Sequence, residues 1–84
     1  MSDDFELPPA LVEKLGGIKT KDAAIEYLRE HGLEISVYPT RRRSLSYQIR
    51  ESSTGRRIEG GDSDERRNSA VYLNVIDKAL GYIK

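Results

Sequence analysis

The sequence contains no cysteine and a single histidine among its 84 residues. Without cysteine, neither disulfides nor thiolate metal sites can stabilise the fold, so we expect stability to come from packing, with formation of a homodimer as an additional source. The lack of thiols is also compatible with a reducing compartment. Because the acidic residues are scattered singly and only one histidine is present, we expect neither a metal nor another cofactor.

Long apolar runs are missing as well. No stretch approaches the roughly 18 consecutive apolar residues of a membrane-spanning helix. Residues 1–6 are acidic, whereas a signal peptide starts with basic residues that an apolar run follows. We therefore expect a soluble, cytoplasmic protein with no membrane partner. Hydrophobic residues make up 37% of the chain and charged residues 33%, which predicts one small domain with a modest core.

Sequence signals of catalysis are absent too. The glycine pairs at 16–17 and 60–61 lack the lysine or third glycine of a phosphate-binding loop. The serines show no pattern that would pair one of them with a base. His31 follows a helical stretch, where an imidazole interacts favourably with the last carbonyl groups. We therefore expect a protein that is not an enzyme.

Apolar and polar residues alternate strictly from 33 to 38 and again from 44 to 50. This period of two is typical of antiparallel strands that bury one face and expose the other. Residues 56–59 predict a short third strand with Ile58 facing inward, which Gly60-Gly61 ends. The inward residues of the first two strands are Leu33, Ile35, Val37, Leu45, Tyr47 and Ile49.

Three segments have the signals of helices. Residues 8–17 begin with two prolines and end with two glycines, which favours a short helix between them. Thr20 is the predicted N-cap of a second helix. Asp62 and Glu65 have the spacing of a capping box, and apolar residues recur at intervals of three or four behind them. We therefore expect a long final helix from Asp62 to Ile83.

Together these segments predict an α+β fold with the order α-α-β-β-β-α. A three-stranded antiparallel sheet is covered by the long C-terminal helix and by the helix that precedes the sheet. We divide the chain into an acidic N-terminal segment with a short helix, residues 1–19, and a single α-β-β-β-α domain, residues 20–84. Residues 1–7 are expected to be disordered or loosely attached, and the short helix after them either packs on the core or binds a partner.

The net charge is zero, but the charges are segregated along the chain. Residues 1–34 carry eight acidic and four basic side chains, a net charge of −4, whereas residues 35–58 carry six arginines and one glutamate, a net charge of +5. Guanidinium groups suit phosphate and carboxylate groups, so the basic stretch predicts a nucleic-acid or acidic partner. The alternative is a solvated surface whose arginines pair with the protein's own acidic groups.

From Thr20 onward the chain resembles a double-stranded RNA-binding domain. The resemblance rests on residues 26–33, Glu-Tyr-Leu-Arg-Glu-His-Gly-Leu, on residues 60–63, Gly-Gly-Asp-Ser, and on the α-β-β-β-α order. It implies that Glu26 faces RNA 2′-hydroxyl groups and that the arginines at 41–43 occupy the loop that enters the next minor groove.

The sequence also departs from that family. Asp64 and Glu65 stand where the family has the basic cluster of its last helix, and Arg66-Arg67 follows them. The loop between the first two strands lacks the family's Gly-Pro and histidine. These departures predict that RNA binding is altered or lost in a shared fold. A second resemblance, over residues 33–82, is to the three-stranded arm-binding domains of phage-type integrases.

Two functions follow from these observations. The first is a small non-enzymatic module that binds nucleic acid, duplex RNA or DNA, through the arginine-rich tip of the predicted hairpin. The second is a protein-interaction or inhibitor domain whose arginine face or helix margin docks on an acidic or apolar protein. The residues that we expect to contact either partner are Arg41, Arg42, Arg43, Arg56, Arg57, Arg66, Arg67 and Glu26.

Overall fold

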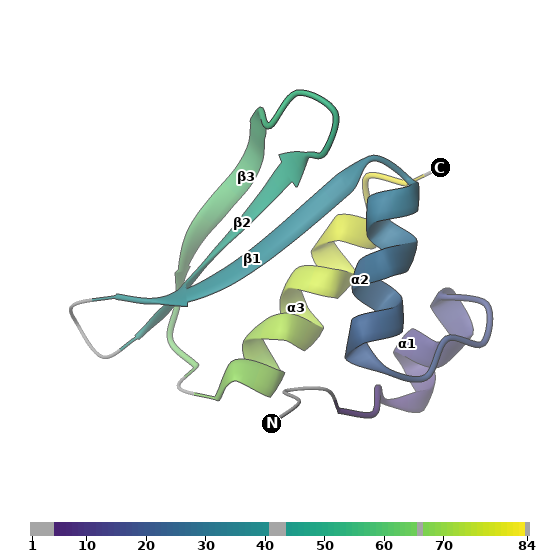
Figure 1. Cartoon of the computed structure of the whole chain (residues 1–84). Helices are drawn as coiled ribbons and strands as arrows, with labels where there is room; N and C mark the ends of the chain where they lie inside the picture. Colours follow the sequence, from purple (N-terminus) through teal and green to yellow (C-terminus); the bar gives the residue numbers. More distant parts are fainter. Residues whose placement is uncertain (1–4, 41–43, 66, 84) are drawn as a thin grey trace.

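The computed structural model describes residues 5–40, 44–65 and 67–83. It confirms the predicted α+β order (Figure 1). The strands form one antiparallel sheet in which β2 lies between β1 and β3. The elements are α1 (Pro9–Lys14), α2 (Lys21–Glu30), β1 (Leu33–Pro39), β2 (Leu45–Glu51), β3 (Arg57–Ser63) and α3 (Asn68–Leu80).

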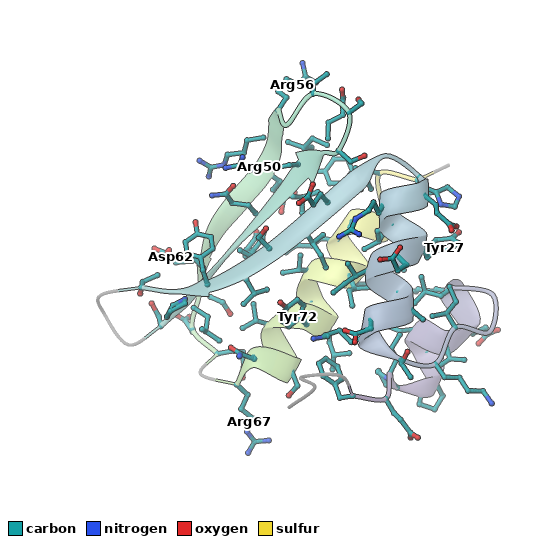
Figure 2. All side chains as sticks on the ribbon, in the orientation of Figure 1. Tyr27, Arg50, Arg56, Asp62, Arg67 and Tyr72 are labelled. Atoms are coloured by element: carbon teal, nitrogen blue, oxygen red, sulfur yellow. The ribbon has the colours of Figure 1, made fainter. Side chains whose placement is uncertain are left out.

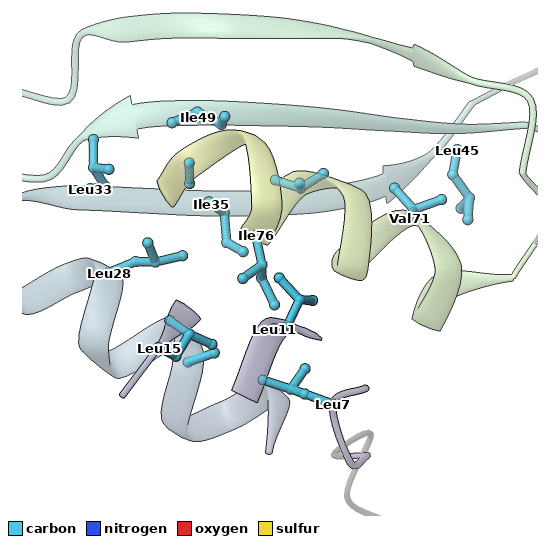
Figure 3. Packing of buried hydrophobic residues seen from close by; sticks show 13 residues of the cluster. Leu7, Leu11, Leu15, Leu28, Leu33, Ile35, Leu45, Ile49, Val71 and Ile76 are labelled. Atoms are coloured by element: carbon cyan, nitrogen blue, oxygen red, sulfur yellow. The ribbon is translucent and has the colours of Figure 1, made fainter. Parts of the chain in front are cut away.

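The helices lie on one side of the sheet and leave its other face uncovered (Figure 1). α2 contacts β1, and α3 contacts both β1 and β2. Leu28 of α2, Ile49 of β2 and Ile76 of α3 are fully buried and join these elements (Figure 3). The alternation of the strands explains this arrangement, because every second side chain points into the core. No helix in the described part of the chain is long and apolar enough to span a membrane.

The N-terminal segment is part of the core. Leu11 of α1 and Leu15, which directly follows α1, are buried and lie beside Leu28 and Ile76 (Figure 3), so α1 packs on the outer side of the α2–α3 pair. The prediction that residues 1–7 are loosely attached is wrong for residues 5–7. Leu7 is buried, and main-chain hydrogen bonds join residues 5–7 to residues 19–21. Residues 1–4 lie outside the described part.

The local signals at the first two helices are confirmed. Pro9 occupies the first position of α1, where its missing N–H group costs no hydrogen bond. The hydroxyl group of Thr20 accepts a hydrogen bond from the Ala23 N–H group at 3.4 Å and caps α2. α2 ends before Gly32, whose φ of 82° lies in the region that favours glycine.

The predicted boundary between the third strand and the last helix is wrong. β3 does not stop at Gly60-Gly61 but continues to Ser63, and α3 begins at Asn68 instead of Asp62. Asp62 is not a helix cap, because it lies opposite Ser46 in the sheet and accepts a hydrogen bond from the Ser46 hydroxyl group. The N-cap of α3 is Arg67, which makes no side-chain capping bond.

Two glycines lie inside β3, and each is next to the side chain of a neighbouring residue. A Cβ atom on Gly60 would come within 2.7 Å of the Arg57 guanidinium group, and one on Gly61 would lie 3.5 Å from the Tyr47 hydroxyl oxygen. Neighbouring side chains therefore fill the space above both residues, on opposite faces of the sheet. Glycine in a strand often marks such a close approach.

Candidate functional site

The uncovered face of the sheet presents three rows of side chains, which we call the open face. Their alternate neighbours, including Leu33, Ile35, Leu45 and Ile49, are buried against the helices, so these side chains lie on the face that the helices leave uncovered. The strand register sets the rows as Glu34, Arg50 and Arg57, then Ser36, Gln48 and Gly60, then Tyr38, Ser46 and Asp62.

Three arginines gather at the end of the sheet next to the turn between β2 and β3. Arg50 and Arg57 are direct partners across the two strands, and Arg56 precedes Arg57 in the chain. All three side chains are exposed, and Figure 2 shows Arg56 and Arg50 toward this end and Asp62 toward the other. We call these three residues the arginine end.

Each arginine of the strands has a fixed neighbour on the open face. The Nε–H group of Arg50 donates a hydrogen bond to the Gln48 side-chain oxygen at 2.6 Å. The guanidinium group of Arg57 lies over Gly60, where a Cβ atom would come within 2.8 Å of its Nε atom. These neighbours restrict the two side chains, and each guanidinium group carries five N–H donors.

Within the described residues, no ion pair joins the arginine end to a carboxylate group. Elsewhere in the described part of the chain Lys14, Lys21, Arg29 and Lys78 form ion pairs with acidic side chains. None of these ion pairs includes Arg50, Arg56 or Arg57. Glu34 is the direct cross-strand neighbour of Arg50, but the two groups form no ion pair within the described residues. The positive charge at this end is therefore available to an external anion.

The opposite end of the open face has a different character. Tyr38 is 41% exposed, and its hydroxyl oxygen accepts a hydrogen bond from the Gln48 side-chain amide at 3.2 Å. Since Gln48 lies two residues along β2 from Ser46, the direct partner of Tyr38, the tyrosine ring extends along the sheet. Gln48 thus links Tyr38 to Arg50 in one line of hydrogen bonds.

The residues predicted to bind a partner do not form one cluster. Arg56 and Arg57 lie together at the arginine end, but Arg67 is at the start of α3, away from them (Figure 2). Glu26 is exposed on α2, on the helix side of the sheet, and pairs with Arg29 at 3.1 Å. The arginines at 41–43 and Arg66 lie outside the described residues.

Sequence reasoning missed three residues of the open face, Tyr38, Gln48 and Arg50. The alternation already placed their side chains on the outer face of the strands. What the sequence could not supply is the register, which makes Arg50 a partner of Arg57 and brings Gln48 between Arg50 and Tyr38.

A groove on the helix side of the molecule is lined in part by acidic side chains, unlike the arginine end. This groove, of about 460 Å³, runs between β3 and α3, and its lining includes Asp62, Asp64, Asp77 and Lys78. Its carboxylate groups repel anions, so a phosphate ligand is not expected there. Among the described residues no group of three His, Cys, Asp or Glu side chains could hold a metal ion.

A polar cluster at the edge of β3 fixes the end of α3 to the sheet. The carboxylate group of Glu59 accepts hydrogen bonds from the hydroxyl groups of Tyr82 at 2.6 Å and Tyr47 at 3.0 Å, and the Lys78 ammonium group lies 3.6 Å away. The hydrogen bonds from Tyr82 and Tyr47 lower the pKa of Glu59. The same bond to Glu59 raises the pKa of Tyr82. The cluster therefore has a structural role.

The remaining titratable candidate is His31, whose Nδ1 atom lies 2.9 Å from the Tyr27 main-chain oxygen at the end of α2. This contact with a terminal carbonyl group is the structural role expected from the sequence.

Comparison of the chain with protein-family models, with curated proteins and with solved structures found no match.

Proposed function

We propose that this protein is a small nucleic-acid-binding module and that the open face of its sheet is the binding surface. The observation that carries the proposal is the arginine end, where Arg50, Arg56 and Arg57 are exposed and form none of the ion pairs that neutralise basic groups elsewhere. Arginine donates paired hydrogen bonds to phosphate oxygens, and the phosphate backbone supplies most of the affinity of such proteins.

The distribution of charge supports this assignment. The protein as a whole is neutral, so long-range attraction contributes little and binding must depend on local contacts. The groove on the helix side carries carboxylate groups, whereas the arginine end carries guanidinium groups. A polyanion is therefore oriented with its phosphate groups toward the arginine end and away from that groove.

An acidic protein would use the same arginines, so the test must separate the two partners. We would measure binding of fluorescently labelled RNA and DNA, each single-stranded and duplex, by anisotropy at a series of salt concentrations. Affinity for nucleic acid should fall steeply as the salt concentration rises. In a plot of the logarithm of the binding constant against the logarithm of the salt concentration, each phosphate contact should contribute a slope of roughly −0.7 to −0.9.

Variants connect the measurement to the open face. Arg50→Ser and Arg57→Ser should each weaken binding about tenfold, because each removes a charge-assisted contact. The matched control is Arg29→Ser, which removes one exposed arginine from α2 on the helix side. It should leave affinity almost unchanged.

Two results would contradict the proposal. One is the absence of binding to every nucleic acid at low salt, which would favour an acidic protein partner. The other is an equal loss of affinity in all three variants, since a nonspecific effect of charge does not depend on which side of the protein carries the arginine.

A further inference from the structure

The open face also carries a flat aromatic ring, and this feature bears on the form of the nucleic acid. We infer that the ligand is a single-stranded nucleic acid, with one base stacked on Tyr38 and neighbouring phosphate groups on Arg50 and Arg57. This inference rests on the proposed function. Nothing in the arginine end alone distinguishes single strands from duplexes, because both present phosphate groups. The distinction comes from the rest of the open face.

Tyr38 has the geometry of a stacking platform. Its hydroxyl oxygen accepts a hydrogen bond from Gln48 at 3.2 Å, which holds the ring along the sheet instead of upright. Tyr38 is nevertheless 41% exposed, while Ser46, its partner across the strands, is only 5% exposed. The ring is thus held by its hydroxyl group and remains partly open to solvent.

The middle row of the open face offers a position for a base at Ser36. Ser36 and Gly60 flank Gln48 on the two neighbouring strands, and the Arg57 guanidinium group lies over Gly60, so the small and exposed side chain of that row is Ser36. A planar group can approach the sheet over Ser36, beside Tyr38. There the Gln48 amide and the Arg50 guanidinium group, already joined at 2.6 Å, offer hydrogen bonds to the edge of a base.

An unpaired base fits these features better than a base pair. In a duplex the flat faces of the bases are covered by their neighbours, and a ring that lies against a sheet cannot reach them. In a single strand the bases can turn outward and stack on aromatic side chains. The other exposed large hydrophobic side chain of the described residues, Tyr82 at 46%, is bound to Glu59 on the helix side, which makes it a matched control.

The test compares the original protein with three tyrosine variants. Labelled single strands of about ten nucleotides, as RNA and as DNA, are titrated beside duplexes of the same sequence. Tyr38→Ala should weaken single-strand binding by about 5- to 140-fold, the value of one stacked base, and should leave duplex binding unchanged. Tyr38→Phe keeps the ring and should bind nearly as well as the original protein, as should Tyr82→Ala.

The outcomes separate the two proposals. If duplexes bind as tightly as single strands and Tyr38→Ala changes neither affinity, the single-strand inference is overturned while nucleic-acid binding stands. If no nucleic acid binds at low salt, the proposed function itself fails. If Tyr38→Phe loses as much affinity as Tyr38→Ala, the hydroxyl group and not the ring is responsible, which also overturns the inference. Circular dichroism of each variant establishes that it is folded.

Discussion

The position of the Arg57 guanidinium group can be tested without changing any charge. Arg57 lies over Gly60, and a Cβ atom added at Gly60 would come within 2.7 Å of one terminal nitrogen and 2.8 Å of Nε. Contacts shorter than 3.0 Å cannot persist, so Gly60→Ala must move the guanidinium group. Because the displaced atoms are the end of a flexible side chain, the cost is a change of rotamer, about 0.5–1.5 kcal/mol.

A neighbouring glycine provides the control. A Cβ atom at Gly61 would lie 3.5–3.7 Å from the Tyr47 ring and hydroxyl group, which is ordinary van der Waals contact on the helix side of the sheet. Neither glycine has a positive φ, so alanine at either position reduces the entropy of the unfolded chain and stabilises the fold by about 0.4–1 kcal/mol. We expect Gly61→Ala to be stabilising and Gly60→Ala to be nearly neutral.

Affinity for nucleic acid should distinguish the two variants. Gly60→Ala keeps the net charge but removes Arg57 from its position, so affinity for nucleic acid should fall by about five- to tenfold, close to the loss of a charge-assisted contact. Gly61→Ala should bind like the original protein. Urea denaturation gives the stabilities and fluorescence anisotropy gives the affinities. A folded Gly60→Ala variant with unchanged affinity would refute the argument that the placement of Arg57 matters.

Three further predictions concern the core, the open face and the edge of the sheet. Ile49→Ala should cost about 2–5 kcal/mol, seen as a lower urea midpoint, whereas the exposed Ser36→Ala should change stability by less than about 0.5 kcal/mol. Glu34→Gln should raise nucleic-acid affinity about two- to threefold, because it removes a negative charge beside Arg50; reduced affinity would contradict an anionic ligand. Hydrogen bonds from Tyr82 and then Tyr47 lower the pKa of Glu59, so their contribution to stability is present above the ordinary value of 4.5 and is lost as the pH falls through the lowered pKa. Tyr82→Phe should flatten this acid dependence in pH-dependent denaturation curves, and a curve identical to that of the original protein would show that the bond to Glu59 contributes nothing.

The elements that the sequence predicted correctly are those whose signals are local. Strict alternation assigned the two faces of β1 and β2, and Thr20 and the paired prolines marked the starts of α2 and α1. Each of these signals depends on residues a few positions apart, which interact in the same way in many folds.

The errors arose where the structure depends on contacts between distant residues. Asp62 is an ordinary helix cap by its chemistry, but in the folded chain it accepts a hydrogen bond from Ser46 across the sheet. Gly60 and Gly61 interrupt a strand by propensity, but Arg57 and Tyr47 lie over them. The sequence alone offers no means of choosing between these alternatives, because the deciding partner is set by the strand register.

The same dependence on register applies to the open face, and it shows which of its features require a functional explanation. A sheet with one uncovered face must carry polar or small side chains there to remain stable in water, and Ser36, Gln48 and Gly60 meet that requirement. Solubility alone does not explain why these arginines have no carboxylate partner. Glu34 stands directly across from Arg50 but forms no ion pair with it within the described residues. Placing Arg50 and Arg57 side by side is also unfavourable, since like charges directly opposite in a sheet destabilise it. The mutual repulsion of these two arginines costs stability, and an anion bound between them, as the proposed function requires, would relieve that repulsion.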